Sequence, residues 1–153
     1  KNGKIGCNGM LYSMNQIRYI ENSISGTGVA LEVNHPLVSK IWKDRTPLPK
    51  NVIFDYDVKY AGVSREEKIA QVRKKMQAFK ADWYLASALD EVAWLLNLRG
   101  SDINCNPVFY AYTLLSQDEI YLFIDEQKIP NELKENLQSI PVQIYPYTSI
   151  LDI

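Results

Sequence analysis

The polar side chains best placed to do chemistry gather in one loop, Arg99-Gly100-Ser101-Asp102-Ile103-Asn104-Cys105-Asn106-Pro107. Nine residues between two apolar segments are more than a turn requires. Loops that a rigid scaffold positions carry a disproportionate share of binding and catalytic residues. We therefore expect this loop to be the functional part of the chain.

The residues around this loop do not complete any familiar catalytic arrangement. His35 is the sole histidine, and no pair of cysteines or histidines has metal-ligand spacing. Ser101 and Asp102 lack a neighbouring base, and no nucleophile elbow, phosphate-binding glycine loop or dinucleotide fingerprint is present. Asp90 and Glu91 are adjacent on a predicted helix, so their side chains diverge by about 100° and cannot act as an acid/base pair. We predict no catalytic residue and no metal ligand in this sequence.

The composition indicates which kinds of partner the protein does not bind. The 153 residues include 17 basic and 18 acidic side chains, so neither a nucleic-acid surface nor an acidic tail is indicated. Cys7 and Cys105 are far apart, which favours reduced thiols. No apolar run approaches the ~18 residues of a membrane span. We expect a soluble cytoplasmic protein that binds neither nucleic acid nor membranes.

The first 50 residues are predicted to form an incomplete domain. A strand at residues 4–7, a helix at 10–24, a strand at 29–33 and a helix at 37–42 follow from periodicity and turn residues. A charged segment with two prolines, residues 43–50, indicates a linker. Because so few elements cannot bury their own apolar faces, we interpret residues 1–50 as the C-terminal part of a preceding domain plus a linker.

Residues 51–153 are predicted to form a second domain. Ser64 and Glu67 have the spacing of a capping box. The helix that follows is expected to bury one row of side chains and to expose a basic face; the row is Ile69, Val72, Met76 and Phe79, and the basic face is Lys68, Arg73, Lys74 and Lys75. A buried strand at 83–86 then leads into a helix at 88–97 with Ser87 as its cap, which indicates an α/β fold.

The last third of the chain adds strands to this sheet. Residues 108–115 and 120–124 are predicted to pair as an antiparallel hairpin that is covered on both faces. A short helix after Pro130 and a strand at 142–145 follow. The chain stops at the start of another helical turn, which indicates truncation there.

A resemblance to a known family rests on four segments. The run Ala88-Leu-Asp-Glu-Val-Ala-Trp-Leu-Leu-Asn-Leu-Arg-Gly-Ser-Asp102, followed by Asn106-Pro-Val-Phe109, resembles the middle domain of the long, three-domain Xaa-Pro aminopeptidases, or aminopeptidases P. Three flanking segments are similar to that family in the same order; they are residues 38–45, 121–125 and 145–151.

This resemblance implies a fold and an activity. It implies a mixed sheet flanked by helices, the ribonuclease H-like creatinase/prolidase N-terminal fold. Family members remove the N-terminal residue from peptides with proline in second place. They use two divalent metal ions, usually manganese, held by a C-terminal pita-bread domain that would follow Ile153. The resemblance therefore implies a non-catalytic region, with no cofactor of its own, that walls the substrate cleft and supports a homodimer.

The resemblance also suggests where a peptide would be met. Arg99 would pair with a peptide carboxylate or carbonyl, Asp90 would shape the mouth that admits the free amine, and Asp102 would lie in the same loop. The alternative is that Arg99 pairs with Asp102 or Asp90 and only fixes the loop. Two other functions stay open: a protein-binding domain of a catalytically dead relative of the histone-chaperone type, and a stand-alone binding module.

Overall fold

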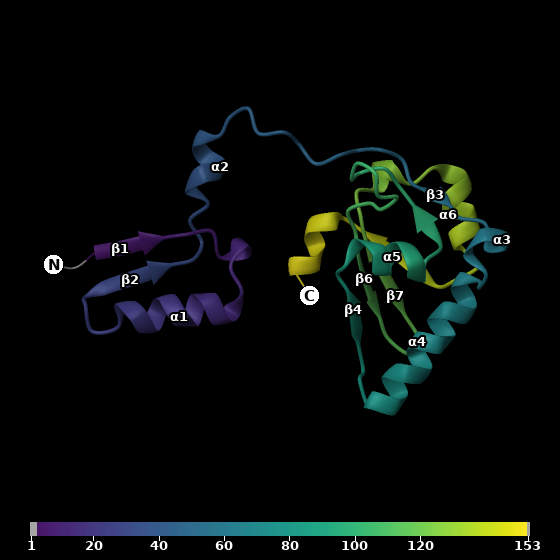
Figure 1. Ribbon diagram of the computed structural model, residues 1–153, viewed down its shortest axis with the longest axis horizontal. Helices are drawn as coiled ribbons and strands as arrows, with labels where there is room; N and C mark the ends of the chain where they lie inside the picture. Colours follow the sequence, from purple (N-terminus) through teal and green to yellow (C-terminus); the bar gives the residue numbers. More distant parts are fainter. Residues whose placement is uncertain (1–2, 153) are drawn as a thin grey trace. The chain divides into compact units, whose positions relative to one another are not determined.

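The computed structural model describes residues 3–152, and the chain divides into two compact units, Lys1–Leu48 and Pro49–Ile153 (Figure 1). We call them the N-terminal unit and the C-terminal unit. None of the helices in the described range is long and apolar enough to cross a membrane.

The N-terminal unit is a strand–helix–strand motif. Strand β1 pairs in parallel with β2, with Ile5 opposite Leu31. Helix α1 begins where Ser13 and Gln16 form a capping box, later than the predicted start at Met10, because the residues before it form a separate 3-10 turn. Its elements are β1 (Gly3–Gly6), η1 (Gly9–Leu11), α1 (Met14–Ile24), β2 (Val29–Glu32) and α2 (Leu37–Ile41).

This unit has no interior. None of its described residues is buried, and several large apolar side chains are exposed. The most exposed include Leu11, Tyr19 and Ile41. A two-stranded sheet with one long helix beside it is too small to enclose a side chain on all sides.

The C-terminal unit has a mixed four-stranded sheet of order β4-β6-β7-β8. Strands β6 and β7 form the predicted antiparallel hairpin, and β7 pairs in parallel with β8. A separate antiparallel pair joins β3 and β5. The elements are β3 (Phe54–Asp55), α3 (Val58–Ala61), α4 (Arg65–Phe79), β4 (Tyr84–Ala86), α5 (Leu89–Leu95), β5 (Leu98–Arg99), β6 (Tyr112–Leu115), β7 (Ile120–Phe123), η2 (Glu126–Lys128), α6 (Asn131–Leu137), β8 (Val142–Tyr145) and η3 (Tyr147–Leu151).

One face of this sheet holds the core. Its side chains pack with apolar residues of α4, α5 and α6; members of the core include Ala86, Leu115, Ile120, Leu122, Ile69, Met76, Val92, Leu95, Leu133 and Leu137. The opposite face is aromatic and covered in part, where Tyr147 of η3 stacks on Tyr112 at 5.2 Å. The hairpin is thus fully buried on one face only, and Tyr121 on the other face is half-buried.

Helix α4 starts as predicted, but its faces differ from the prediction. The Ser64–Glu67 capping box is present. Lys68, expected in solvent, is only 2% exposed, whereas Phe79, expected in the core, is 81% exposed. The core ends before the last turn of α4, so the apolar row of the helix continues past the residues that can cover it.

The strand–helix junction after α4 also departs from the prediction. Helix α5 is capped at Ala88 without a side-chain hydrogen bond, so Ser87 is not its cap. Strand β4 is an edge strand rather than a buried one, and Leu85 is exposed. Strand β6 covers only the second half of the expected 108–115, because the amides before it bond to the preceding loop.

Candidate functional site

The loop of residues 99–107 is tied back on itself. The Asp102 amide donates to the Val108 carbonyl at 3.1 Å, and the Gly100 amide donates to the Pro107 carbonyl at 3.4 Å. A side chain on Gly100 would place its Cβ 2.8 Å from the Cβ of Phe109, so any residue larger than glycine would force the loop or Phe109 to shift. The loop is therefore packed against the core rather than free.

Asp102 is the centre of this packing. Its carboxylate forms an ion pair with Lys128 of η2, and the two side chains are 0% and 2% exposed. The amide of Tyr110 donates to the same carboxylate oxygen, Oδ2, at 2.8 Å. The other oxygen, Oδ1, is buried and has no partner among the described residues. A buried charge without its partner is costly, so this pair fixes the loop to η2.

Arg99 is held by the main chain. Its Nη1 donates to the carbonyls of Ala93 at 2.9 Å and Leu98 at 2.8 Å, and its guanidinium lies 4.3 Å from the centre of the Tyr56 ring. In the part of the chain that the structure describes, Arg99 forms no ion pair with Asp102 or Asp90, which the alternative interpretation required. Asp90 is exposed in the first turn of α5. The three candidate residues thus occupy three different environments.

Lys68 is a second buried cation that the sequence pattern does not reveal. Its ammonium donates to the Trp94 carbonyl at 3.0 Å and to Asn97 Oδ1 at 2.5 Å. Burial lowers the pKa of Lys68, and the charge of Arg99 lowers it further. Asn97 adopts a left-handed backbone, φ 50°, which brings its amide to the carbonyl of Val63 as well. Lys68 therefore binds α4 to the end of α5.

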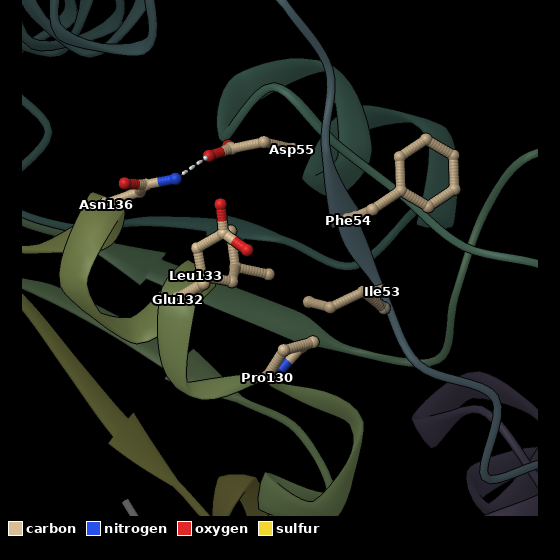
Figure 2. A pocket seen from close by; sticks show the side chains of 7 residues that line it. All are labelled: Ile53, Phe54, Asp55, Pro130, Glu132, Leu133 and Asn136. Atoms are coloured by element: carbon tan, nitrogen blue, oxygen red, sulfur yellow. Dashed lines mark hydrogen bonds between the residues drawn. The ribbon is translucent and has the colours of Figure 1, made fainter.

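A hollow of about 230 Å³ opens between β3 and α6 (Figure 2). Ile53 and Leu133 form its apolar floor, while Asp55 and Glu132 supply carboxylates. Asn136 closes one side by donating to Asp55 at 2.8 Å. We call this hollow the β3–α6 cleft.

A second hollow of about 480 Å³ shares Asp55 and Asn136 with this cleft. Arg65 forms an ion pair with Asp55, and its Nη1 is buried without a partner among the described residues. The Ser139 hydroxyl donates to Glu66 at 2.6 Å and is the main cause that lowers the pKa of this carboxyl group. Amide and ammonium groups of a peptide would find hydrogen-bond acceptors here. The residues that line the two hollows come from separate elements, so no sequence motif indicates either of them.

The side chains present do not fit a two-metal centre. Among residues 3–152, no group of three or more His, Cys, Asp or Glu side chains lies together as a metal site requires. His35 is hydrogen-bonded to Glu32, and the other carboxylate oxygen of Glu32 is paired with Lys4. The imidazole of His35 and the carboxylate of Glu32 are therefore already bound to each other and to Lys4.

Comparison with known proteins identifies this fold. Residues 44–153 match the family described as the Creatinase/Prolidase N-terminal domain. The chain is 46% identical over 125 residues to the probable Xaa-Pro aminopeptidase P of Laccaria bicolor, which covers 81% of the chain and 19% of that protein. It is 37% identical over 150 residues to the probable Xaa-Pro aminopeptidase P of Ajellomyces dermatitidis, covering 97% of the chain and 24% of that protein.

A solved structure agrees with these relatives. The X-prolyl aminopeptidase of Caenorhabditis elegans, described as a cytosolic enzyme with a di-nuclear active site, superposes with a TM-score of 0.85 at 29% identity. The match covers 99% of this chain and 25% of that one. The fold defines a creatinase/prolidase N-terminal domain. The chain belongs to the Xaa-Pro aminopeptidase P family, and it spans about a quarter or less of the length of the relatives it matches.

Proposed function

We propose that this chain is a non-catalytic region of a metal-dependent Xaa-Pro aminopeptidase, which removes the N-terminal residue from peptides with proline second. The similarity to an Xaa-Pro aminopeptidase P along 97% of the chain is the observation that carries this proposal. The whole protein would act on proline-containing peptides in the cytoplasm.

The division of labour within the parent protein is part of the same proposal. The two divalent metal ions, manganese by family resemblance, would be held by a catalytic domain elsewhere in the parent. The division of this chain between Leu48 and Pro49 supports a boundary near residue 50 between the end of a first domain and a middle domain. The chain would wall the substrate cleft and support a homodimer.

The three candidate residues take different roles in this proposal. Asp90 is exposed and can meet a peptide amine directly. Arg99 is half-buried, and its orientation is fixed by two main-chain carbonyls and the Tyr56 ring. Asp102 is a positioning residue, because its buried pair with Lys128 sets the course of the loop.

Steady-state kinetics of the full-length parent test whether Asp90 and Arg99 contact the peptide substrate. We expect Asp90→Asn to raise KM for an Xaa-Pro peptide and to leave kcat unchanged, since a binding contact is lost without a change in the reacting groups. Asp118→Asn changes another exposed carboxylate, in the β6–β7 turn, and is the matched control. Arg99→Ala should lower kcat/KM, and Arg99→Lys should restore little of it because an ammonium lacks the planar fork. Unchanged kinetics in a folded Arg99→Ala enzyme would show that Arg99 does not contact the peptide substrate.

A direct assay tests the proposal that catalysis lies elsewhere. The purified 153-residue chain is incubated with Mn²⁺ and an Xaa-Pro peptide, and release of the N-terminal residue is followed. We expect no release above the buffer background. Metal-dependent cleavage by this chain alone would overturn the proposal.

A further inference from the structure

A wide groove follows the exposed side of α4, away from the β3–α6 cleft. Its volume is about 810 Å³, and its wall is mostly apolar. The lining residues are Gln71, Val72, Lys74, Lys75, Met76, Ala78, Phe79, Ala81, Tyr84 and Trp94. Helix α4 supplies most of the lining residues, and Tyr84 of β4 and Trp94 of α5 lie on the other side. We call it the α4 groove.

Two aromatic side chains project from the α4 groove into solvent. Phe79 is 81% exposed in the last turn of α4, and Trp94 is 47% exposed on α5. Met76, which also lines the groove, belongs to the core, and Val72 packs against that core. Burying large aromatic side chains is worth more than burying most others, so this exposure leaves a strong driving force unused.

The charges along the groove have one sign. Lys74 and Lys75 are its only charged lining residues, both are exposed, and neither forms an ion pair among the described residues. Glu91 does not line the groove, but it accepts a hydrogen bond at 3.3 Å from the hydroxyl of Tyr84, which does. An occupant with carboxylates near the two lysines would match this pattern.

The shape favours a helical segment over a small molecule. Residues 71–79 span about 12 Å along the helix axis, which is a little over two turns. Their apolar members recur at the spacing with which one helix packs against another. The groove is an open trough, whereas small ligands are usually buried over most of their surface.

We propose that the α4 groove binds an amphipathic helix of a partner protein, with apolar side chains seated between Phe79 and Trp94 and acidic side chains against Lys74 and Lys75. This is the helix-in-groove mode of recognition, with anchors at i, i+4 and i+7. It does not depend on the peptidase activity of the parent.

A titration with designed helices tests this. The probe is a 14-residue helical peptide without tryptophan, with Leu at three positions spaced i, i+4 and i+7 and Glu on both flanks. The comparison peptide has Lys in place of each Glu. Chemical shifts of the Trp94 indole N–H and of amides 71–81 in the 153-residue chain report binding. We expect the Glu peptide to bind and the Lys peptide to bind at least about tenfold more weakly, with the difference shrinking at high salt.

Matched variants locate the contact. Phe79→Ser and the double change Lys74→Glu/Lys75→Glu should each lower the affinity of the chain for the Glu peptide by at least about tenfold. Phe54→Ser and Lys40→Glu/Lys43→Glu change exposed residues that do not line the groove, and should leave the affinity for the Glu peptide unchanged. All four changes affect exposed side chains, so folding is preserved and checked by amide dispersion.

Three results would overturn the proposal. The first is equal binding of both peptides, which would indicate unspecific apolar contact. The second is an absence of shifts at millimolar peptide. The third is concentration-dependent self-association in sedimentation that Phe79→Ser abolishes while the Glu peptide fails to bind, which would assign the groove to a second copy of this chain.

Discussion

The two units start their helices in the same way but differ in what lies beneath them. Helices α1 and α4 both begin at a serine capping box, Ser13 with Gln16 and Ser64 with Glu67. Beneath α4 lies a core of buried side chains, whereas no described residue of the N-terminal unit is buried. Capping sets where a helix begins, and burial sets whether it is stable. The N-terminal unit has a capped helix, but none of its described residues is buried.

Separating the units gives the largest expected difference. Residues 49–153 expressed alone should melt in one cooperative transition by circular dichroism. Residues 1–48 alone should show no cooperative transition, because ordering a residue costs about 1–2 kcal/mol and the described residues of this unit include no buried side chain to offset it. A sharp melting transition of the short fragment would show that the two units do not differ in this way.

Breaking the buried Asp102–Lys128 ion pair should destabilise the C-terminal unit, whereas breaking the exposed pair of the N-terminal unit should not. Lys128→Met leaves the Asp102 carboxylate buried and unpaired, and should lower the free energy of unfolding by about 3–5 kcal/mol in urea titrations. The matching change in the N-terminal unit, Lys4→Met, removes an exposed pair with Glu32 and should leave the titration curve unchanged. Equal effects of the two changes would contradict the burial of the Asp102–Lys128 pair.

Filling the space at Gly100 should have a smaller effect. In Gly100→Ala the new Cβ meets Phe109 at 2.8 Å and Ile53 at 3.3 Å, so we expect a loss of about 1–3 kcal/mol. Gly26 of the N-terminal unit has φ +77° and nothing within 4 Å, so Gly26→Ala carries only the left-handed backbone penalty of about 1–2 kcal/mol. Thermal unfolding measures the first change, and the loss of helical ellipticity measures the second. An unchanged melting temperature in Gly100→Ala would mean that the loop of residues 99–107 shifts to accommodate the new Cβ without loss of stability.

The smallest expected effect is a pH dependence. The folded pKa of Lys68 is lowered below 10.5 by burial, so above that lowered value the unfolded state binds more protons than the folded state. The free energy of unfolding should therefore rise with pH up to about 10.5, relative to Lys68→Met, which lacks this titration. Lys4 of the N-terminal unit has a raised pKa, because Glu32 accepts its hydrogen bond, so its contribution falls with rising pH instead. Parallel pH profiles for wild type and Lys68→Met would contradict the burial of this ammonium.

Local signals in the sequence predict much of this fold. The capping box at Ser64, the β6–β7 hairpin and the strand at 142–145 follow from spacing and turn residues that act over a few positions. The α/β class agrees with the structure, as does the mixed sheet that the family resemblance implies. The caps, the hairpin and the short strand depend on neighbours in sequence, which is the information that a local pattern contains.

Features that depend on distant residues were not predictable. Periodicity placed Phe79 in the core and Lys68 in solvent, because it cannot show where the sheet ends or that Asn97 and Trp94 would surround the ammonium. Asp102 was identified as a candidate, but its partner Lys128 lies on another element. The β3–α6 cleft likewise joins residues from separate elements that share no motif.

The central hairpin of the C-terminal sheet has a consequence for how this unit forms. Strands β6 and β7 are joined by the short turn Ser116-Gln117-Asp118-Glu119, whereas their outer neighbours β4 and β8 come from distant parts of the chain. Closing a short loop is faster than closing a long one, so the hairpin can serve as the folding nucleus. Substitutions such as Leu122→Ala should then slow refolding, while substitutions in β8 should mainly speed unfolding.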